Sequence, residues 1–384
     1  MGWAMHNFYE FFAGGGMARA GLGSEWKCMF ANDFDHKKSK TYQEYWGTDA
    51  LKTADVGTLT VKDLPGMADL VWGSFPCQDL SLAGAGAGLQ GDRSGTFWPF
   101  WKLMQSLIAD GRAPSIVTLE NVCGTLTSHD GKDFSAICSE LQKEGYRLGA
   151  MVIDAALFVP HSRPRLFIIA VRRDIEILPE LVGEASTLWH NSTLRRAYGK
   201  LPDTIKKNWI WWRLPKPSAS EISLTSIIEE HPACVRWHTS EETKKLLAMM
   251  SPLNRAKVEE AQRTGNRIVG CIYKRTRNDE FGRKVQRAEI RFDNTSGCLR
   301  TPAGGSSRQL ILVVEGTTIK SRLISSRETA RLMGLPEDYP LPVNYNEAYH
   351  LTGDGVVVPV VRYLAANIFE PILFNQKNQY SEAA

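Results

Sequence analysis

A cysteine and a glutamate each stand just after a short apolar segment, and together they suggest a catalytic pair. Cys77 lies in the sequence Gly-Ser-Phe-Pro-Cys-Gln, which follows the apolar segment Leu70–Trp72. Glu120, followed by Asn-Val, ends the apolar segment Ile116–Leu119. A thiolate is a nucleophile, and a carboxyl group within reach can exchange a proton with the same substrate. Taken singly, a cysteine is more often an inert buried thiol and a glutamate a surface carboxylate. A catalytic role is therefore favoured only if both apolar segments end at the same site.

A second set of residues, near the beginning of the chain, has the chemistry to bind an adenosine. Gly14-Gly15-Gly16 follow the apolar run Phe8–Phe12, and Asp33 comes 19 residues after Gly14. Glycines let the backbone approach a ligand closely, and a carboxylate at this position accepts hydrogen bonds from the ribose hydroxyls. Phe34 can stack on the adenine, and Asp55 can accept a hydrogen bond from its amino group. The glycine cluster by itself is equally compatible with an ordinary tight turn.

The third glycine of the nicotinamide-dinucleotide fingerprint is absent, because Arg19 stands where that glycine belongs. S-adenosylmethionine carries an adenosine but no pyrophosphate, so it does not need the third glycine. The pattern therefore favours S-adenosylmethionine over a nicotinamide cofactor.

The elements that must position these residues are strands and helices that alternate over the first 175 residues. The apolar segments above and a further one, Leu166–Val171, have the length and composition of buried strands, and Trp98–Ile108 and Phe134–Glu144 have helical patterns. Such alternation predicts an α/β, Rossmann-like fold with a mostly parallel sheet covered by helices on both faces. Because ligands bind at the carboxyl ends of parallel strands, both sets of residues are expected at one edge of the sheet.

The pattern changes near Asp174, where periodicity becomes poor and charge and tryptophan increase. We expect a catalytic and cofactor-binding domain over residues 1–185, a smaller irregular domain over 186–321, and a return to the first domain over 322–384. A chain of 384 residues is long enough for one large and one small domain. The cluster Trp209–Trp212 is expected in the core of the smaller domain.

Composition narrows the class of protein without identifying it. Hydrophobic residues make up 43% and charged residues 23%, and the net charge of +4 permits nucleic-acid binding without requiring it. Seven scattered cysteines without a Cys-x-x-Cys pair suggest neither a disulfide framework nor a metal site. Neither a signal peptide nor an uninterrupted run of about 18 apolar residues is recognised, so a cytoplasmic protein is expected.

Positive charge is concentrated between Arg263 and Arg300, where ten Lys or Arg residues face four Asp or Glu residues. Tyr273, Phe281 and Phe292 are interleaved with them. This stretch is the best candidate for contact with nucleic-acid phosphates, and some of its arginines can read guanine edges. A solvated, charge-rich surface is the alternative. The candidate DNA-binding arginines are Arg275, Arg277, Arg283, Arg287 and Arg291.

In their order along the chain, these segments resemble the motifs of the cytosine-C5 DNA methyltransferase family. The Pro-Cys-Gln and Glu-Asn-Val pairing is the most specific part of the resemblance, and residues 174–316 are covered only near their end. The matching segments are Phe12–Gly16, Asn32–Phe34, Pro76–Gln78 with Ser81 and Gly84–Gly95, Glu120–Val122, Arg163–Arg165, Thr301–Gly305, Arg327–Gly334 and Gly353–Val360.

The resemblance implies an S-adenosylmethionine-dependent methyltransferase fold with a target-recognition domain, of bacterial restriction–modification or orphan type. It implies catalytic roles for Cys77, Glu120, Asn121, Arg163 and Arg165. With the adenosine-binding residues above, it implies cofactor contacts by Phe12, Ala13, Gly14, Gly16, Asp33, Phe34, Asp55, Pro76, Asp354 and Val356. It implies contacts to double-stranded DNA by Ser81, Gln90, Thr301 and Gly304, with a monomer as the active form.

The implied reaction begins with attack of the Cys77 thiolate on carbon 6 of a cytosine flipped out of the helix. Carbon 5 then takes the methyl group from the sulfonium, while Glu120 binds or protonates ring nitrogen 3. Arg163 or Arg165 lowers the pKa of the thiol or holds the carbonyl oxygen of the base. The base that removes the carbon-5 proton is not identified by the sequence.

The chain departs from the family pattern at four positions. Met17 replaces a frequent glycine, Asp33 the common glutamate, His161 the usual glutamine before the arginine pair, and Asp354 the usual asparagine.

Three other interpretations compete with a DNA cytosine-C5 methyltransferase. The branch of the family that methylates transfer RNA carries Cys-Phe-Thr, which does not occur here. A DNA-binding regulator that has lost catalysis is disfavoured by the intact Cys77 and Glu120. Amino-group DNA methyltransferases are excluded because the chain has no Pro-Pro.

Overall fold

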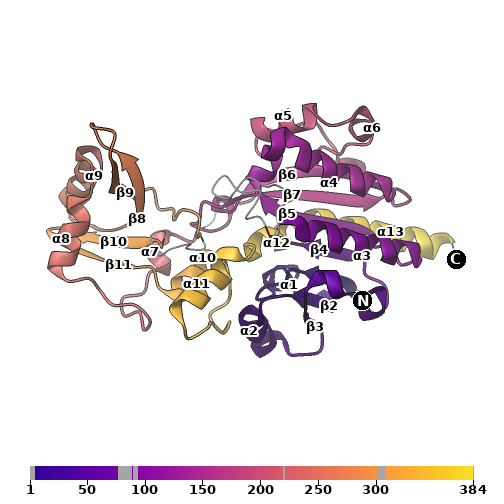
Figure 1. Cartoon of the computed structure of the whole chain (residues 1–384), viewed down its shortest axis with the longest axis horizontal. Helices are drawn as coiled ribbons and strands as arrows, with labels where there is room; N and C mark the ends of the chain where they lie inside the picture. The colour runs from indigo at the N-terminus through magenta and orange to yellow at the C-terminus, as the bar shows by residue number, and fades with distance from the viewer. Residues whose placement is uncertain (1–4, 77–88, 90–93, 219–220, 301–307, 384) are drawn as a thin grey trace. The chain divides into compact units, whose positions relative to one another are not determined.

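The computed structural model describes residues 5–76, 89, 94–218, 221–300 and 308–383 (Figure 1). It divides into two compact units. Unit 1 comprises Met1–Asp154, Pro164–Lys216 and Val356–Ala384, and unit 2 comprises Ala155–Arg163 and Pro217–Gly355.

Unit 1 is built on a seven-stranded sheet in the order β3-β2-β1-β4-β5-β7-β6 (Figure 1). Strands β1 to β5 are all parallel to one another, and β7 is antiparallel to both β5 and β6. The α/β methyltransferase-like fold expected from the sequence is confirmed, and each predicted strand is present. The strands are β1 (His6–Phe11), β2 (Trp26–Asp33), β3 (Leu51–Thr53), β4 (Leu70–Gly73), β5 (Ile116–Val122), β6 (Tyr146–Asp154) and β7 (Pro164–Arg172).

Helices pack on the sheet because each presents an apolar face to it. Phe100 and Leu103 of α3 and Ile137 of α4 join one core cluster with strand residues such as Val71 and Leu119. Close packing also joins α1 to α12, since a Cβ atom at Gly21 would lie 2.4 Å from Cβ of Val361. The helices are α1 (Met17–Leu22), α2 (His36–Trp46), α3 (Phe97–Ala109), α4 (Lys132–Lys143), α5 (Ser192–Gly199), α6 (Asp203–Lys206), α12 (Val358–Leu364) and α13 (Glu370–Ala383), with a π-helical turn at Ala365–Phe369.

Residues 186–216 pack with unit 1, although the sequence pattern suggested that the second domain begins at 186. The backbone N–H of Ile210 donates to the carbonyl oxygen of Leu148 in β6 at 2.9 Å. A Cβ atom at Gly149 would lie 1.9 Å from the Ile210 carbonyl oxygen, so only glycine permits this approach. The tryptophan cluster, with Trp212 fully buried, therefore belongs to the larger unit.

Unit 2 contains a four-stranded antiparallel sheet in the order β11-β10-β8-β9. Two helices cover one face of it, where Leu246 and Val258 pack with Ile272 and Leu312. The sequence suggested only an irregular domain here. The elements are α7 (Leu224–Ile227), α8 (Ser240–Ala248), α9 (Pro252–Arg263), β8 (Arg267–Asn278), β9 (Lys284–Arg291), β10 (Leu310–Glu315), β11 (Thr318–Leu323), α10 (Ser326–Leu332) and α11 (Tyr345–Asp354).

Among the described residues, one helical segment, Tyr345–Gln379, is long and apolar enough to cross a membrane by length and composition alone. More than half of its most apolar window is buried inside the protein, which is the burial expected of a core helix.

Candidate active site

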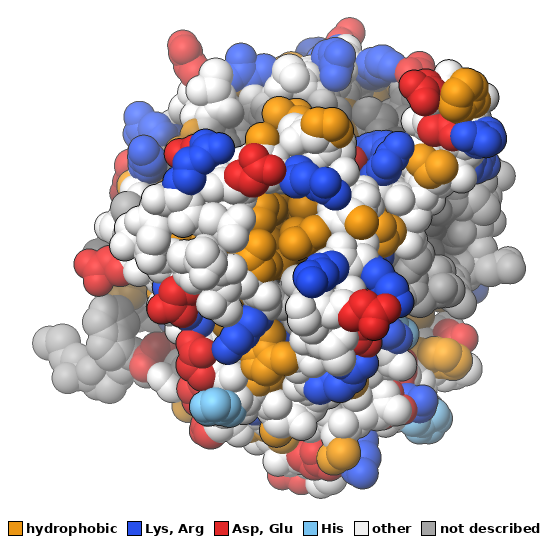
Figure 2. Space-filling view, turned by 90° about the vertical axis from the view of Figure 1, so that its left-hand side faces the viewer, with side chains coloured by type: hydrophobic (Ala, Val, Ile, Leu, Met, Phe, Trp, Pro, Cys, Tyr) orange, Lys and Arg blue, Asp and Glu red, His pale blue; other side chains and the backbone are white. Residues whose placement is uncertain are grey.

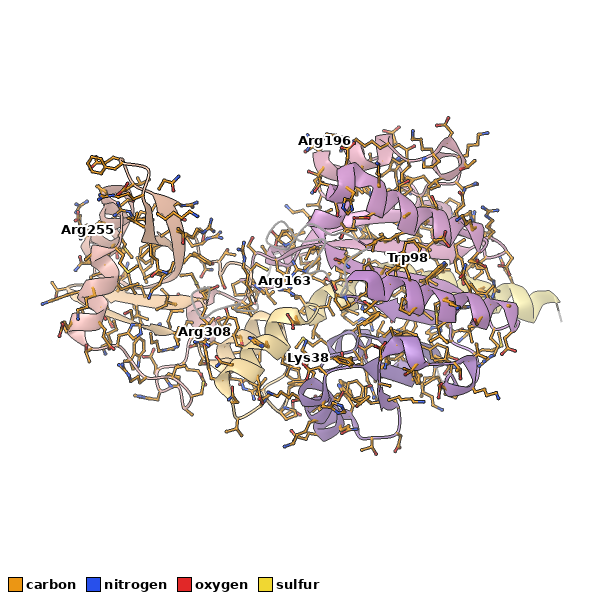
Figure 3. All side chains as sticks on the ribbon, in the orientation of Figure 1. Lys38, Trp98, Arg163, Arg196, Arg255 and Arg308 are labelled. Carbon is orange, nitrogen blue, oxygen red and sulfur yellow. The ribbon has the colours of Figure 1, made fainter. Side chains whose placement is uncertain are left out.

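The carboxyl ends of β1 and β2 are joined by the side chain of Asp33. One carboxylate oxygen accepts a hydrogen bond from the backbone N–H of Gly14 at 2.7 Å, and the other accepts from the N–H of Asp35 at 2.7 Å. Burial raises the pKa of Asp33, and the positive charge of Lys38 on α2 opposes that rise (Figure 3). Asp33 therefore fixes the glycine loop in addition to offering acceptors to a ligand.

The glycine loop adopts a conformation that few side chains tolerate. Phe12, Gly14 and Gly16 all have left-handed backbones, with φ of 57°, 55° and 78°. Trp46 of α2 supports the loop, because its indole N–H donates to the carbonyl oxygen of Gly15 at 3.2 Å. A Cβ atom at Gly16 would lie 2.4 Å from the same indole nitrogen. The motif thus depends on Trp46, which the sequence analysis did not single out.

The surroundings of the loop suit the adenosine of S-adenosylmethionine. Phe34 is 73% exposed beside the buried Asp33, so its ring is available for stacking. Asp55 is exposed and accepts a hydrogen bond from the N–H of Gly57 at 2.8 Å, which fixes one of its oxygens. An exposed aromatic ring can stack on the adenine, and two carboxylates can accept hydrogen bonds from the ribose hydroxyls and the adenine amino group.

Of the remaining predicted cofactor residues, Ala13, Pro76 and Val356 belong to unit 1 and Asp354 belongs to unit 2. Ala13 is buried and its N–H donates to the Asn32 carbonyl oxygen at 2.9 Å, while Pro76 is half-buried after β4. Val356 is buried and begins the last segment of unit 1. Asp354 is exposed and ends α11 in unit 2.

Glu10 is a buried carboxyl group under the glycine loop that the sequence analysis missed. One of its oxygens has no hydrogen-bond partner among the described residues, and burial raises its pKa to about 8. The other oxygen accepts from the N–H of Arg19 at 3.4 Å. An acidic residue inside the apolar run Phe8–Phe12 was the signal that could have identified it.

Glu120 and Arg165 form an ion pair at the carboxyl end of β5. Nε of Arg165 lies 3.2 Å from a carboxylate oxygen of Glu120, and the two side chains are 15% and 8% exposed. The antiparallel pairing of β5 with β7 brings them together, because Val122 is paired with Arg165. A pair with so little exposure is weakly screened by solvent, so Arg165 can hold the orientation of the carboxylate.

Asn121 ties the end of β5 to the segment after β4. Its side-chain N–H donates to the carbonyl oxygen of Phe75 at 3.1 Å, and its side-chain oxygen accepts from the N–H of Val122 at 2.8 Å. Phe75 directly precedes Pro76. Cys77, Ser81 and Gln90, which the sequence analysis assigned to the catalytic loop, lie outside the described residues.

Arg163 has different partners from Arg165. It belongs to unit 2, where one terminal nitrogen donates to the carbonyl oxygens of Gly353 and Gly355, both at 2.8 Å. The other donates to the Leu299 carbonyl oxygen at 3.2 Å. Arg163 is only 2% exposed. The arginine pair of the sequence motif therefore separates into one residue bound to Glu120 and one bound to backbone carbonyls.

His161, which replaces a usual glutamine, uses both ring nitrogens. Nδ1 lies 3.1 Å from the Leu332 carbonyl oxygen, and Nε2 accepts from the N–H of Leu299 at 3.2 Å. These two contacts require the neutral ring with its proton on Nδ1. The substitution therefore preserves the one-donor, one-acceptor pattern that a glutamine side chain also provides.

The predicted DNA-binding arginines lie on or beside β8 and β9. Arg275 and Arg277 both pair with Glu289, at 3.4 and 2.6 Å. Arg287 stands directly opposite Arg275 in the strand pairing. The remaining two pair locally, Arg283 with Asp279 and Arg291 with Asp293, and the predicted Thr301 and Gly304 lie outside the described residues.

Asp33→Ala is expected to weaken binding of S-adenosylhomocysteine by about 10- to 100-fold, because charge-assisted hydrogen bonds contribute about 1.5–3 kcal/mol each. Titration calorimetry measures this affinity directly. Asp49→Ala is the matched control, since Asp49 is an exposed carboxylate of the same unit. Equal affinities for the two variants would show that Asp33 does not support the cofactor.

Comparison with known proteins identifies the family. The profile described as C-5 cytosine-specific DNA methylase matches residues 6–370. Type II methyltransferase M.NlaX of Neisseria lactamica is 26% identical over 94% of this chain and 95% of its own length. Type II methyltransferase M.HhaI of Haemophilus parahaemolyticus is 23% identical over 96% of this chain and 95% of its own length.

Solved structures share the fold. The crystal structure of Schizosaccharomyces pombe (S. pombe) Dnmt2 methyltransferase superimposes with a TM-score of 0.58 and 17% identity, covering 96% of this chain and 99% of that one. A putative DNA modification methyltransferase encoded within an Escherichia coli (E. coli) prophage gives a TM-score of 0.56 at 16% identity, covering 96% and 99%. The chain belongs to the C-5 cytosine-specific DNA methylase family and is an S-adenosylmethionine-dependent DNA (cytosine-5-)-methyltransferase.

Proposed function

We propose that this enzyme methylates one cytosine within a specific sequence of double-stranded DNA, through a covalent bond between Cys77 and carbon 6 of the base. The contact that supports this most directly is the hydrogen bond from Asn121 to the Phe75 carbonyl oxygen. It ties the Glu120-containing strand end to the segment that leads into Cys77. The nucleophile and the carboxyl group then act from neighbouring parallel strands on one base.

The residues divide the chemistry between them. Glu120 hydrogen-bonds ring nitrogen 3, which draws electron density from carbon 6 and favours attack by the thiolate. Arg165 orients Glu120 and has further donors for the carbonyl oxygen of the base. S-adenosylmethionine, when bound, supplies the methyl group for carbon 5. Loss of the carbon-5 proton and of Cys77 from carbon 6 then completes the cycle.

Arg163 acts on this reaction as a positioning residue. Its hydrogen bonds to Gly353 and Gly355 hold the turn on either side of Asp354, and its bond to Leu299 holds the approach to the Thr301–Gly305 motif. A guanidinium bound by three carbonyl oxygens is rigid, which suits a structural support rather than a group that meets the substrate.

DNA contact is assigned to the β8–β9 hairpin. Arg275 and Arg287 are directly opposite each other, and like charges in that position repel. Glu289, which Arg275 and Arg277 share, balances only part of this positive charge, so an anionic partner such as a phosphate is favoured here. The face that carries α8 and α9 shows Lys and Arg side chains scattered among Asp and Glu, around a hydrophobic patch (Figure 2). Charge on that face is mixed, so the hairpin is the better site for phosphates.

We also propose a restriction–modification role, by analogy with relatives that are named Type II methyltransferases. In that role the enzyme acts in the cytoplasm as a monomer and protects the site of a cognate endonuclease. Size-exclusion chromatography with light scattering tests the monomer, and protection of methylated DNA from digestion tests the pairing.

Expression in a methylation-free bacterial host, followed by bisulfite sequencing of the genomic DNA, tests the activity. Protected cytosines in one short context are expected. Glu120→Gln should lower the rate of methyl transfer by about 10²- to 10⁴-fold, because the amide cannot supply a proton to ring nitrogen 3. Glu180→Gln, which changes an exposed carboxylate of the same unit, is the control. An unchanged rate for Glu120→Gln would remove Glu120 from the mechanism.

A further inference from the structure

The outer part of β8 and β9 forms a two-stranded ribbon whose two faces differ in chemistry. Five opposed pairs make up this ribbon, from Lys274 opposite Ala288 to Asn278 opposite Lys284. We propose that Thr276, Asn278 and Gln286 read base edges in the major groove, while the arginines of the other face contact phosphates. This assignment rests on the proposed recognition of duplex DNA.

The strand pairing decides which side chains share a face. Directly opposite residues point to the same side of an antiparallel pair, and successive residues alternate. Arg275, Arg277 and Arg287 therefore share one face with Glu289, and the ion pairs of Arg275 and Arg277 with Glu289 agree with this. The other face carries, in order from the base of the ribbon, Lys274 opposite Ala288, Thr276 opposite Gln286, and Asn278 opposite Lys284.

The second face has the donors and acceptors that distinguish base pairs. The amides of Asn278 and Gln286 can form two hydrogen bonds to N6 and N7 of adenine, and the methyl group of Thr276 can contact that of thymine. All three side chains are exposed. The arginine face is less suited to this task, because two of its arginines already share Glu289.

The ribbon has dimensions that fit the groove. Five residue pairs extend about 17 Å at roughly 3.4 Å per residue. The major groove is about 12 Å wide and admits a two-stranded ribbon. With the polar face toward the bases, the lysines at either end lie near the flanking phosphate chains, and the long arginine side chains of the outer face can extend past the edges of the ribbon to reach them.

Both ends of the ribbon are fixed, so its side chains are presented without a large ordering cost. At its base, the N–H of Ala288 donates to the Met249 carbonyl oxygen at 3.1 Å, and the N–H of Ile290 donates to the Asn254 side-chain oxygen at 3.0 Å. At its tip, Asp279 accepts hydrogen bonds from the N–H groups of Phe281 and Arg283, at 2.9 and 2.8 Å.

Two measurements on the full-length enzyme separate the two faces. Bisulfite sequencing of a randomised duplex library gives the sequence preference, and binding at several salt concentrations gives the dependence of affinity on salt. The variants are Asn278→Ala and Gln286→Ala on the polar face and Arg287→Gln on the arginine face. Asn266→Ala is the matched control, because it removes an exposed amide from the same unit away from the ribbon.

Each polar-face variant is expected to lose about tenfold discrimination at one position of the site, with an unchanged salt slope. Arg287→Gln should weaken binding to all sequences alike and reduce the salt slope by about one. Polar-face variants with the wild-type preference, or an Arg287→Gln variant with an altered preference, would overturn the assignment. Selecting the duplexes that bind from the same library measures sequence preference without requiring methyl transfer. If the enzyme proves inactive, that result contradicts the proposed reaction, and the binding selection still tests the assignment of the two faces.

Discussion

Cys77→Ser will reduce methyl transfer by about 10⁴-fold or more while leaving DNA binding intact. A serine hydroxyl is far less acidic than a thiol, so almost none of it is an anion at neutral pH. Without a nucleophile at carbon 6, carbon 5 does not become electron-rich enough to take the methyl group. The loss should therefore appear in kcat, with the affinity for DNA and for S-adenosylhomocysteine close to that of the wild type.

A duplex with 5-fluorocytosine at the target position makes the bond itself observable. Fluorine at carbon 5 cannot leave as a proton does, so the adduct between sulfur and carbon 6 accumulates after methyl transfer. Denaturing electrophoresis should show this adduct for the wild type and for the control Cys234→Ser, whose thiol is exposed in unit 2. An adduct that still forms with Cys77→Ser would assign the nucleophile elsewhere.

One rule of sheet geometry was sufficient to predict that Asp33 and Glu120 lie at the same edge of the sheet. Asp33 and Glu120 were each placed at the end of an apolar segment, and parallel strands bring such ends to one edge. The tertiary partners of these residues carried no comparable signal. Trp46 supports the glycine loop from α2, and nothing in the spacing of that helix indicates the contact.

The two arginines of the Arg-Pro-Arg motif show a second limit of prediction from sequence. They have the same charge and stand two residues apart, so sequence alone left either one to meet the substrate. Only the pairing of β7 with β5 reveals that Arg165 contacts Glu120, whereas Arg163 contacts the backbone of residues far along the chain. Partners that distant in sequence are fixed by the fold and not by local pattern.

The sheet of unit 2 escaped prediction for a different reason. The inner parts of β8 and β9 contribute buried residues to the core of unit 2. Their outer parts carry mostly exposed, charged or polar side chains on both faces. A ribbon that extends beyond its core lacks the apolar alternation by which strands are recognised. The same charged positions were singled out as a candidate DNA contact from their composition, which does not depend on periodicity.

Glu328→Gln is expected to lower the free energy of unfolding of unit 2 by about 3–5 kcal/mol, because it leaves a buried arginine without its counter-charge. Arg322 and Glu328 are both fully buried, and their two hydrogen bonds measure 2.8 and 2.6 Å. Glu328 also accepts from the N–H groups of Ser325 and Glu229, both at 2.7 Å. One carboxylate therefore joins β11, the start of α10 and the segment before α8.

Urea denaturation followed by circular dichroism measures the free energy of unfolding of Glu328→Gln. Two further variants test whether the unpaired charge causes the destabilisation. Glu337→Gln breaks the exposed pair with Arg331 nearby and should cost less than about 1 kcal/mol. The double variant Arg322→Met with Glu328→Gln removes the uncompensated positive charge. Its amide oxygen still accepts from one of the two backbone N–H groups, those of Ser325 and Glu229, so it should recover part of the stability. If the double variant is no more stable than Glu328→Gln, the unpaired charge is not the cause. The lost carboxylate hydrogen bonds at the start of α10 then account for the destabilisation.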